Sequence, residues 1–327
     1  MIILITTTLS FIIFFYYKKI SNLINLYDFP DIELKKHKFV TAPIGGVFIF
    51  FIFITTFFLD QIFLKSKIDF FSNNLEFNLF LFFCFILLII GIIDDKIKLT
   101  SNLKLIIFIL LFTLYCFFSN DITLNYFYTS FEKNNFNLGK LSILFSVFCY
   151  ISFTQAFNMY DGLDKQSGLL LLVYLIFFYF LTNFSVIFIY LLIPLIFFII
   201  YNKKGKLFLG NNGSNFLSFF VAVIAIRLAE NQVLTVEDIL VLFAIPGYEL
   251  IRLFFFRIKE NKSPLNGDLN HIHHLLIKKF NYIQTLLIIL SLTVIPVLGI
   301  ILKIQIYILI IVQLISYIFL IYYVRSQ

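Results

Sequence analysis

Long apolar runs alternate with short polar segments along almost the whole chain. Each run has about 16 to 21 residues, close to the ~20 that an α-helix needs to cross the hydrocarbon core of a bilayer. The pattern therefore predicts membrane-spanning helices. The first is expected to be a retained helix, because it has neither a basic leader nor a small-residue cleavage site. The predicted spans are residues 2–17, 44–64, 77–93, 103–118, 141–157, 167–182, 184–201, 214–229, 239–256, 282–302 and 304–324.

Composition agrees with an integral membrane protein. Of the 327 residues, 61% are apolar and 13% are charged, against ~25% charged residues in a soluble domain, and the mean hydropathy is +0.98. Little sequence remains for a soluble domain. We therefore expect a single transmembrane domain over residues 1–327, with an all-α polytopic fold of about 11 transmembrane helices.

The basic residues predict the orientation. Most of the 25 Lys and Arg lie in loops that follow odd-numbered spans, and cytoplasmic loops carry such an excess. These loops are expected in the cytoplasm, which places the N-terminus outside and the C-terminus in the cytoplasm. The net charge of +7 is explained by this topology and by anionic lipid headgroups, and no nucleic-acid partner is expected because no nucleic-acid-binding motif is present.

Four polar clusters each follow an odd-numbered span, so all four are expected at one face of the membrane. The first is Asp94 with Asp95, at the end of the third span. Adjacent carboxylates repel unless a cation or a proton stabilises them, so the pair indicates a divalent metal. The alternative is a solvated helix end that nearby lysines compensate.

The second cluster follows the fifth span and places Asn158, Asp161 and Asp164 at three-residue intervals. In a helical or near-helical turn these side chains project to one side, where they could bind a metal or a nucleotide. The dipeptide Asp161-Gly162 is also a plain turn signal. Polar residues at the end of a long apolar run are nevertheless costly without a partner.

The third cluster is the loop Gly-Asn-Asn-Gly-Ser at residues 210–214. Its glycines let the backbone approach a ligand closely, and its N–H groups lead into the next helix, so they could hold an anion such as phosphate. By itself, such a sequence is only a loop.

The fourth cluster lies between residues 257 and 274 and combines Arg257 and Asp268 with three histidines. The imidazoles could bind zinc, but ligands so close in sequence converge only in a particular turn. Contact with phosphate or diphosphate is equally compatible with them, and a solvated basic loop is the plain alternative. One aqueous site built from the four clusters indicates metal-dependent chemistry on a substrate that is part lipid and part water-soluble.

Together and in this order, the clusters resemble the polyprenyl-phosphate N-acetylhexosamine-1-phosphate transferases, membrane enzymes of the glycosyltransferase family 4 type that begin bacterial cell-surface glycans. The resemblance covers most of the chain. It starts at residues 37–46, continues through the first two clusters, and reaches the last cytoplasmic loop with Ser263-Pro264, Asp268 and the run His-Ile-His-His. The form of that run resembles the branch that initiates O-antigen, teichoic-acid or related polymers.

The resemblance implies an enzyme of the EC 2.7.8 class that depends on Mg²⁺, with Mn²⁺ as a substitute. It would transfer HexNAc-1-phosphate from a UDP-N-acetylhexosamine such as UDP-GlcNAc to polyprenyl (undecaprenyl) phosphate and release UMP. The lipid phosphate, the nucleotide sugar and the bacterial inner (plasma) membrane are the implied partners. The sequence leaves open whether the protein forms a homodimer.

The resemblance also implies roles for individual residues. The implied catalytic residues are Asp94, Asp95, Asp161, Asp164 and His271. The implied substrate-binding residues are His37, Lys98, Lys104, Asn158, Arg257, His273 and His274. The implied metal ligands are Asp95, Asp164 and Asn211.

Three positions depart from the family pattern. Asn211 stands where the family usually has an aspartate that binds magnesium, so metal affinity should fall because the amide has no charge. Lys165 replaces a glycine that usually follows the second cluster. Glu249 replaces an aspartate of the ninth span, and it could pair with Arg252 at i,i+3.

Two other classes stay open. Asn211 motivates the first, a catalytically impaired relative that binds lipid or nucleotide sugar as a partner subunit. The second is a membrane transporter, which would need charged groups near mid-membrane or broken helices. The acids of this chain lie at span ends on one face, which argues against transport.

Overall fold

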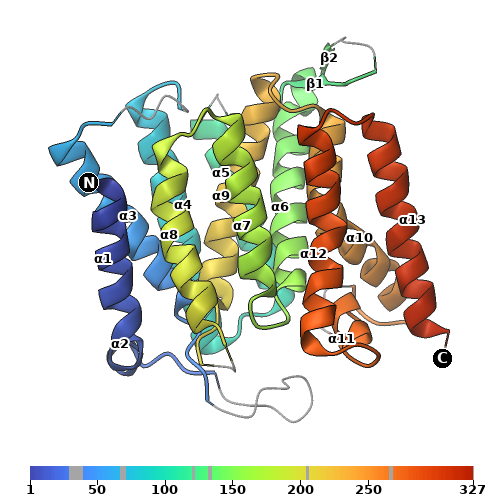
Figure 1. Ribbon diagram of the computed structural model, residues 1–327. Helices are drawn as coiled ribbons and strands as arrows, with labels where there is room; N and C mark the ends of the chain where they lie inside the picture. Colours follow the sequence, from blue (N-terminus) through green and yellow to red (C-terminus); the bar gives the residue numbers. More distant parts are fainter. Residues whose placement is uncertain are drawn as a thin grey trace. The chain divides into compact units, whose positions relative to one another are not determined.

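The computed structural model describes residues 1–28, 40–66, 71–119, 122–131, 135–203, 206–264 and 268–326. In these ranges the chain is built of helices joined by short loops, with a small antiparallel sheet (Figure 1). The sheet pairs β1 (Tyr126–Tyr128) with β2 (Asn135–Asn137). The expected all-α polytopic fold is confirmed.

An α-helix overlaps each of the eleven predicted spans. These helices are α1 (Ile2–Phe15), α3 (Gly45–Phe63), α4 (Asn74–Ile97), α5 (Ser101–Phe118), α6 (Ser142–Tyr160), α7 (Gln166–Leu181), α8 (Val186–Tyr201), α9 (Gly210–Glu230), α10 (Val236–Lys259), α12 (Tyr282–Ile301) and α13 (Ile306–Arg325). Among the described residues, the short helices that the sequence does not predict are α2 (Tyr17–Ile24), η2 (Gly139–Leu141) and α11 (Ile272–Leu276).

Length and apolar composition suit most of these helices to a membrane. In the described part of the chain, 8 helices meet both criteria, and α1 with α2, bent by 65°, could form a ninth span. The remaining two, α7 and α8, are apolar but have 16 residues each. The chain is therefore a multi-pass membrane protein, and the count of eleven spans stays a prediction.

Three helices are longer than predicted, and they therefore include residues of the polar clusters. The helix α4 extends past the predicted boundary to Ile97, which places both aspartates of the first cluster in its last turn. The helix α9 begins at Gly210, so the predicted loop is the first turn of a helix. The helix α6 continues to Tyr160 and includes Asn158.

The chain divides into two compact units. Unit 1 comprises residues 1–100 and 164–221, and unit 2 comprises residues 101–163 and 222–327. The single domain expected from composition stays a prediction. In unit 1, α1, α3 and α8 pack against one another and α7 packs against α8 (Figure 1). Aromatic rings fill this core, where Phe53 and Phe80 both contact Phe220.

In unit 2, α10 packs against α6, α12 and α13, and α5 packs against α6. The short helix α11 contacts α12 and α13. The side-chain amide of Gln313 on α13 donates to the carbonyls of Leu292 on α12 and Val241 on α10, at 2.8 and 3.2 Å. A buried amide bonded in this way stabilises a helix packing that apolar contacts alone would specify poorly.

Candidate active site

The aspartates of the first cluster occupy the last turn of α4 in unit 1. Asp94 is 2% exposed, and its Oδ1 accepts a hydrogen bond from the backbone N–H of Leu99 at 2.9 Å. That bond reaches past the helix end, where Lys98 has a left-handed conformation with φ of 52°. The bond restrains the Asp94 carboxylate at the end of the helix. Lys98, predicted to bind substrate, is exposed beside it.

The second aspartate, Asp95, accepts four hydrogen bonds from the first turn of α9. Its Oδ1 accepts from the backbone N–H and the side-chain amide of Asn211, at 3.0 and 2.9 Å. Its Oδ2 accepts from the backbone N–H and the side-chain amide of Asn212, at 3.2 and 2.6 Å. The start of a helix attracts an anion, and here the carboxylate of Asp95 takes that place.

Asn212 joins three helices. Its side chain is fully buried, and its Oδ1 accepts a hydrogen bond from the backbone N–H of Val47 at 3.0 Å. Its amide nitrogen donates to the carbonyl of Pro43 as well as to Asp95. Asn212 had no predicted role, and the one sequence signal for it is a second amide beside Asn211 in a glycine-containing loop.

Glycines let the same three helices touch. A Cβ on Gly46 of α3 would lie 2.1 Å from the Cα of Gly213, and a Cβ on Gly91 of α4 would lie 2.2 Å from the Cα of Asn212. No side chain fits into such a space, so backbone meets backbone. At the start of α9, Gly210 has φ of 76°, a conformation that only glycine adopts without strain.

The segment before α3 packs against the segment before α9. The N–H groups of Gly45 and Gly46 donate to the carbonyls of Phe208 and Leu209, at 2.9 and 3.0 Å, and the N–H of Phe208 donates to Ala42 at 3.0 Å. Gly45 and Gly46, which lie in the segment where the family resemblance starts, thus shape this junction. His37, predicted to bind substrate, lies outside the described residues.

The last aspartate of the second cluster also belongs to unit 1. Asp164 precedes α7 and is partly buried. The next residue, Lys165, is the N-cap of α7 and has φ of 66°, and its backbone N–H donates to the side chain of Asn202. The positive φ at this position explains why the family usually has a glycine where this chain has Lys165.

The rest of the second cluster lies in unit 2, beside the histidines. Asn158 is in the last turn of α6, and Asp161 is the residue that ends that helix. A Cβ on Gly162 would lie 2.0 Å from Nε2 of His273, and His273 is 2% exposed. Two clusters more than a hundred residues apart in sequence therefore meet within this unit. Lys104, on α5 of unit 2, is partly buried.

The three histidines pack against one another at the start of α11. The ring centroids of His271 and His273 are 5.3 Å apart, and those of His273 and His274 are 4.3 Å apart. Burial, with Arg257 and Arg252 nearby, lowers the pKa of His271, although Glu249 and Asp268 act in the opposite direction. The imidazole of His271 is therefore neutral at pH 7.

Arg257 bonds two residues that precede the histidines in the sequence, Pro264 and Asp268. It is 4% exposed, its Nε forms an ion pair with Asp268 at 2.6 Å, and its Nη1 donates to the carbonyl of Pro264 at 2.7 Å. Burial alone would raise the pKa of Asp268, but hydrogen bonds from Arg257 and from the N–H of Asn270 hold that pKa below its ordinary value. The predicted role of Arg257 toward substrate stays a prediction.

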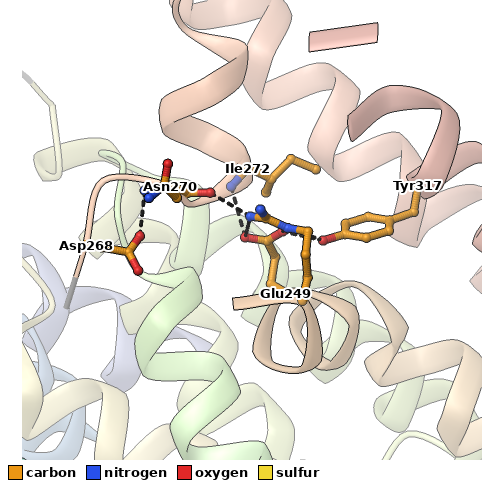
Figure 2. A network of polar contacts seen from close by, with 6 residues as sticks. Glu249, Asp268, Asn270, Ile272 and Tyr317 are labelled. Atoms are coloured by element: carbon orange, nitrogen blue, oxygen red, sulfur yellow. Dashed lines mark hydrogen bonds and ion pairs between the residues drawn. The ribbon is translucent and has the colours of Figure 1, made fainter. Parts of the chain in front are cut away.

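A buried network fastens the histidine segment to α10 and α13 (Figure 2). The carboxylate of Glu249 accepts two hydrogen bonds from Arg252, at 2.9 and 3.0 Å, and one from the hydroxyl of Tyr317. The N–H of Ile272 donates to Glu249 at 2.9 Å, and Arg252 donates to the carbonyl of Asn270 at 2.6 Å. The predicted pairing of Glu249 with Arg252 is confirmed, whereas the contribution of Tyr317 was not predicted.

The predicted metal ligands fit a cation poorly in this arrangement. Each oxygen of Asp95 already accepts two hydrogen bonds, and Asn211 presents its amide nitrogen to Asp95. Among the residues that the structure describes, no three His, Cys, Asp or Glu side chains are grouped so as to hold a metal ion. The zinc interpretation of the histidines therefore has no support from this geometry.

The predicted residues thus fall into two groups. Unit 1 holds the aspartate pair, the loop at the start of α9 and Asp164, and unit 2 holds Asn158, Asp161, Arg257 and the histidines. A common site for the two groups stays a prediction. The fold is that of a polytopic helical membrane protein, and in each unit carboxylates, amides, imidazoles or cations lie at the ends of apolar helices.

Comparison with known proteins finds similarity to one family of membrane transferases. Residues 77–229 match the model of glycosyl transferase family 4. An undecaprenyl-phosphate alpha-N-acetylglucosaminyl 1-phosphate transferase of Thermotoga maritima is 28% identical over 81% of this chain and 77% of its own length. Its namesake in Escherichia coli O157:H7 is 24% identical over 81% of this chain and 72% of its own length. A probable undecaprenyl-phosphate N-acetylglucosaminyl 1-phosphate transferase of Bacillus subtilis is 28% identical over 58% and 55%. The chain is therefore similar to glycosyl transferase family 4 over residues 77–229, and to these transferases over most of its length.

Proposed function

We propose that this protein transfers N-acetylhexosamine 1-phosphate from a UDP-N-acetylhexosamine to polyprenyl (undecaprenyl) phosphate, as the first step of a cell-surface glycan. The observation that carries the proposal is the buried carboxylate and amide cluster joining the end of α4 to the start of α9, inside the region that matches the family. The names of the relatives supply the lipid phosphate and suggest GlcNAc as the sugar.

The proposed reaction is a displacement at phosphorus. An oxygen of the lipid phosphate attacks the sugar-bearing phosphorus of the donor, and the bond from that phosphorus to the oxygen bridging the two phosphates breaks. The electron pair leaves with UMP, and a lipid diphosphate sugar remains. Catalysis of such transfers consists mostly of positioning and of electrostatic stabilisation of phosphate oxygens.

We assign the residues of the two units to different parts of this task. Asp94, which is buried and restrained at the end of α4, acts on the lipid phosphate. Asn158 and Asp161 organise the nucleotide. Lys98, Lys104 and Arg257 balance the diphosphate charge in a site of low dielectric. The imidazoles of His271, His273 and His274 donate hydrogen bonds to the diphosphate oxygens.

Magnesium remains part of the proposal, because the resemblance implies it and because oxygen ligands suit it, with manganese as a substitute. Of the three predicted metal ligands, we propose Asp164 alone as a ligand, because Asp95 and Asn211 are hydrogen-bonded to each other. The basic loops support a location in the bacterial inner membrane with the site facing the cytoplasm. A homodimer is also proposed, and the mass of the detergent-solubilised protein tests it.

The test is UMP release by detergent-purified protein with polyprenyl phosphate and a panel of UDP-N-acetylhexosamines, across a magnesium titration. We expect release with at least one donor and a loss of about 100-fold or more in Asp94→Asn, in line with removal of an essential carboxylate. Folding of the variant is checked by its thermal unfolding. No release from any donor would contradict the proposal. An impaired relative or a transporter is not favoured, given that the relatives are named as transferases.

A further inference from the structure

The carboxylate of Asp95 is bonded entirely by protein donors. Asn211 supplies two of them to Oδ1 and Asn212 supplies two to Oδ2, one backbone N–H and one side-chain amide in each case. Hydrogen bonds of this kind favour the charged form of a carboxylate and offset part of the cost of burying it.

The same two amides fix the arrangement of three helices. Asn212 also bonds Val47 and Pro43 at the start of α3, while Gly91 brings the backbone of α4 against Asn212 itself. Because backbone is in contact with backbone here, a small shift of Asp95 away from Asn211 would separate α4 from α9. The position of neighbouring Asp94 depends on the same contact, since both aspartates are in the last turn of α4.

We propose that Asn211 and Asn212 are positioning residues that hold the Asp95 carboxylate by hydrogen bonds, so that this part of the site assembles without a divalent cation. An aspartate at position 211 would instead place a second carboxylate against Asp95 and would need a cation or a proton between the two. The inference rests on the proposed function only in treating the junction of α3, α4 and α9 as part of a transferase site.

The test is thermal unfolding of the full-length protein in detergent, without substrate, in EDTA and in ~10 mM MgCl₂. We expect Asn211→Asp to lower the Tm in EDTA by about 4 °C or more, and MgCl₂ to restore most of the loss. MgCl₂ should shift the wild-type Tm much less. Asn211→Ala, which removes the amide without adding charge, should lower the Tm equally in EDTA and in MgCl₂.

Asn231→Asp is the matched control, because Asn231 is exposed beyond the other end of α9. Its Tm should respond to MgCl₂ as the wild type does. Equal magnesium shifts in the wild type and in Asn211→Asp, or an Asn211→Asp protein as stable as the wild type in EDTA, would overturn the proposal. If Asn211→Asp does not fold, an Asn211→Ala protein with an unchanged Tm would overturn it and an equal loss in both buffers would support it.

A second measurement on the same proteins separates this inference from the proposed function. UMP release is measured in the wild type and in Asn211→Ala at saturating magnesium. A positioning role predicts that kcat falls in Asn211→Ala while the magnesium concentration at half-maximal rate stays within about 2-fold. A shift of tenfold or more in that concentration would assign Asn211 to the metal and overturn the inference. Absence of any transfer would count against the proposed function and leave the Tm result standing.

Discussion

Single residues of this chain are held in positions that their type alone does not favour. Lys165 begins α7 with φ of 66°, and Lys98 ends α4 with φ of 52°. A side chain other than glycine costs about 1–2 kcal/mol in the left-handed region. Lys165 follows Asp164 directly, and the N–H of Lys98 donates to the carbonyl of Asp94, so local strain occurs next to two of the predicted site acids.

The strain at Lys165 is testable. We expect Lys165→Gly to raise the Tm by about 2–4 °C, because the glycine relieves roughly 1 kcal/mol of backbone strain. Lys165→Ala keeps the Cβ and removes the charge, so it should give no increase. Thermal unfolding in detergent measures both variants. An equal gain in the two would show that the lysine charge, and not the backbone, is the cause.

His271 predicts a dependence of stability on pH. Its pKa is lowered in the folded protein, chiefly by burial, so below about pH 6.5 the unfolded chain takes up a proton that the folded chain refuses. The contribution of neutral His271 to the free energy of unfolding is therefore fully present above that pH. It is lost as the pH falls toward the lowered pKa. The lowered pKa of Asp268 also makes the protein less stable as the pH falls. That loss occurs at a lower pH, below the ordinary pKa of an aspartate.

The measurement is the fall in Tm between pH 7.5 and pH 5.5, in the wild type and in His271→Asn. We expect a smaller fall in the variant, because it lacks the imidazole that must stay neutral. A fall of the same size in both proteins would assign the pH dependence to other groups.

At the scale of elements, close contact of helix backbones determines the site in unit 1. The helices α3, α4 and α9 meet at Gly46, Gly91 and Gly213, with Asn212 bonded between them. Polar residues that join helices in this way specify one packing among several that apolar surfaces allow. In unit 2 the network of Glu249 and Arg252 does the same for the histidine segment.

Gly91 provides a test of this packing with an internal control. A Cβ there would lie 2.2 Å from the Cα of Asn212, whereas a Cβ on Gly247 of α10 would have nothing within 4 Å. We expect Gly91→Ala to lose about 1–3 kcal/mol of stability through overpacking and most of its transfer activity. Gly247→Ala should keep or slightly raise the Tm, since alanine favours a helix. Loss of activity in both variants would contradict the interpretation.

At the scale of the whole molecule, the basic residues predict which face of the membrane each loop occupies. A cysteine introduced at exposed Ser130, in the loop after the fourth predicted span, should react with an impermeant maleimide in intact cells. One at Ser326, near the C-terminus, should react only after the membrane is permeabilised. The wild type gives the background, since its cysteines lie in helices and are buried or partly buried. The reverse pattern would invert the predicted topology.

Much of the architecture was predictable because it depends on local composition. Each apolar run became a helix, since a long run with few charges has no other way to satisfy its backbone in a membrane. Boundaries were less accurate. The sequence predicts a loop over residues 210–214, whereas Gly210, Asn211 and Asn212 form the first turn of α9. The side-chain amides and N–H groups of Asn211 and Asn212 donate to Asp95, which lies 116 and 117 residues away in the sequence.

The sequence by itself determined the class of protein, the succession of apolar helices, and the residue types suited to phosphate chemistry, because these follow from hydrophobicity and from side-chain chemistry. Tertiary structure alone decided how those residues are used. It bonds Asp95 to two amides instead of leaving it open to a metal, packs Gly162 against His273, and brings Tyr317 to Glu249. Such contacts join residues distant in the chain, and their geometry depends on how helices pack, which no local pattern records.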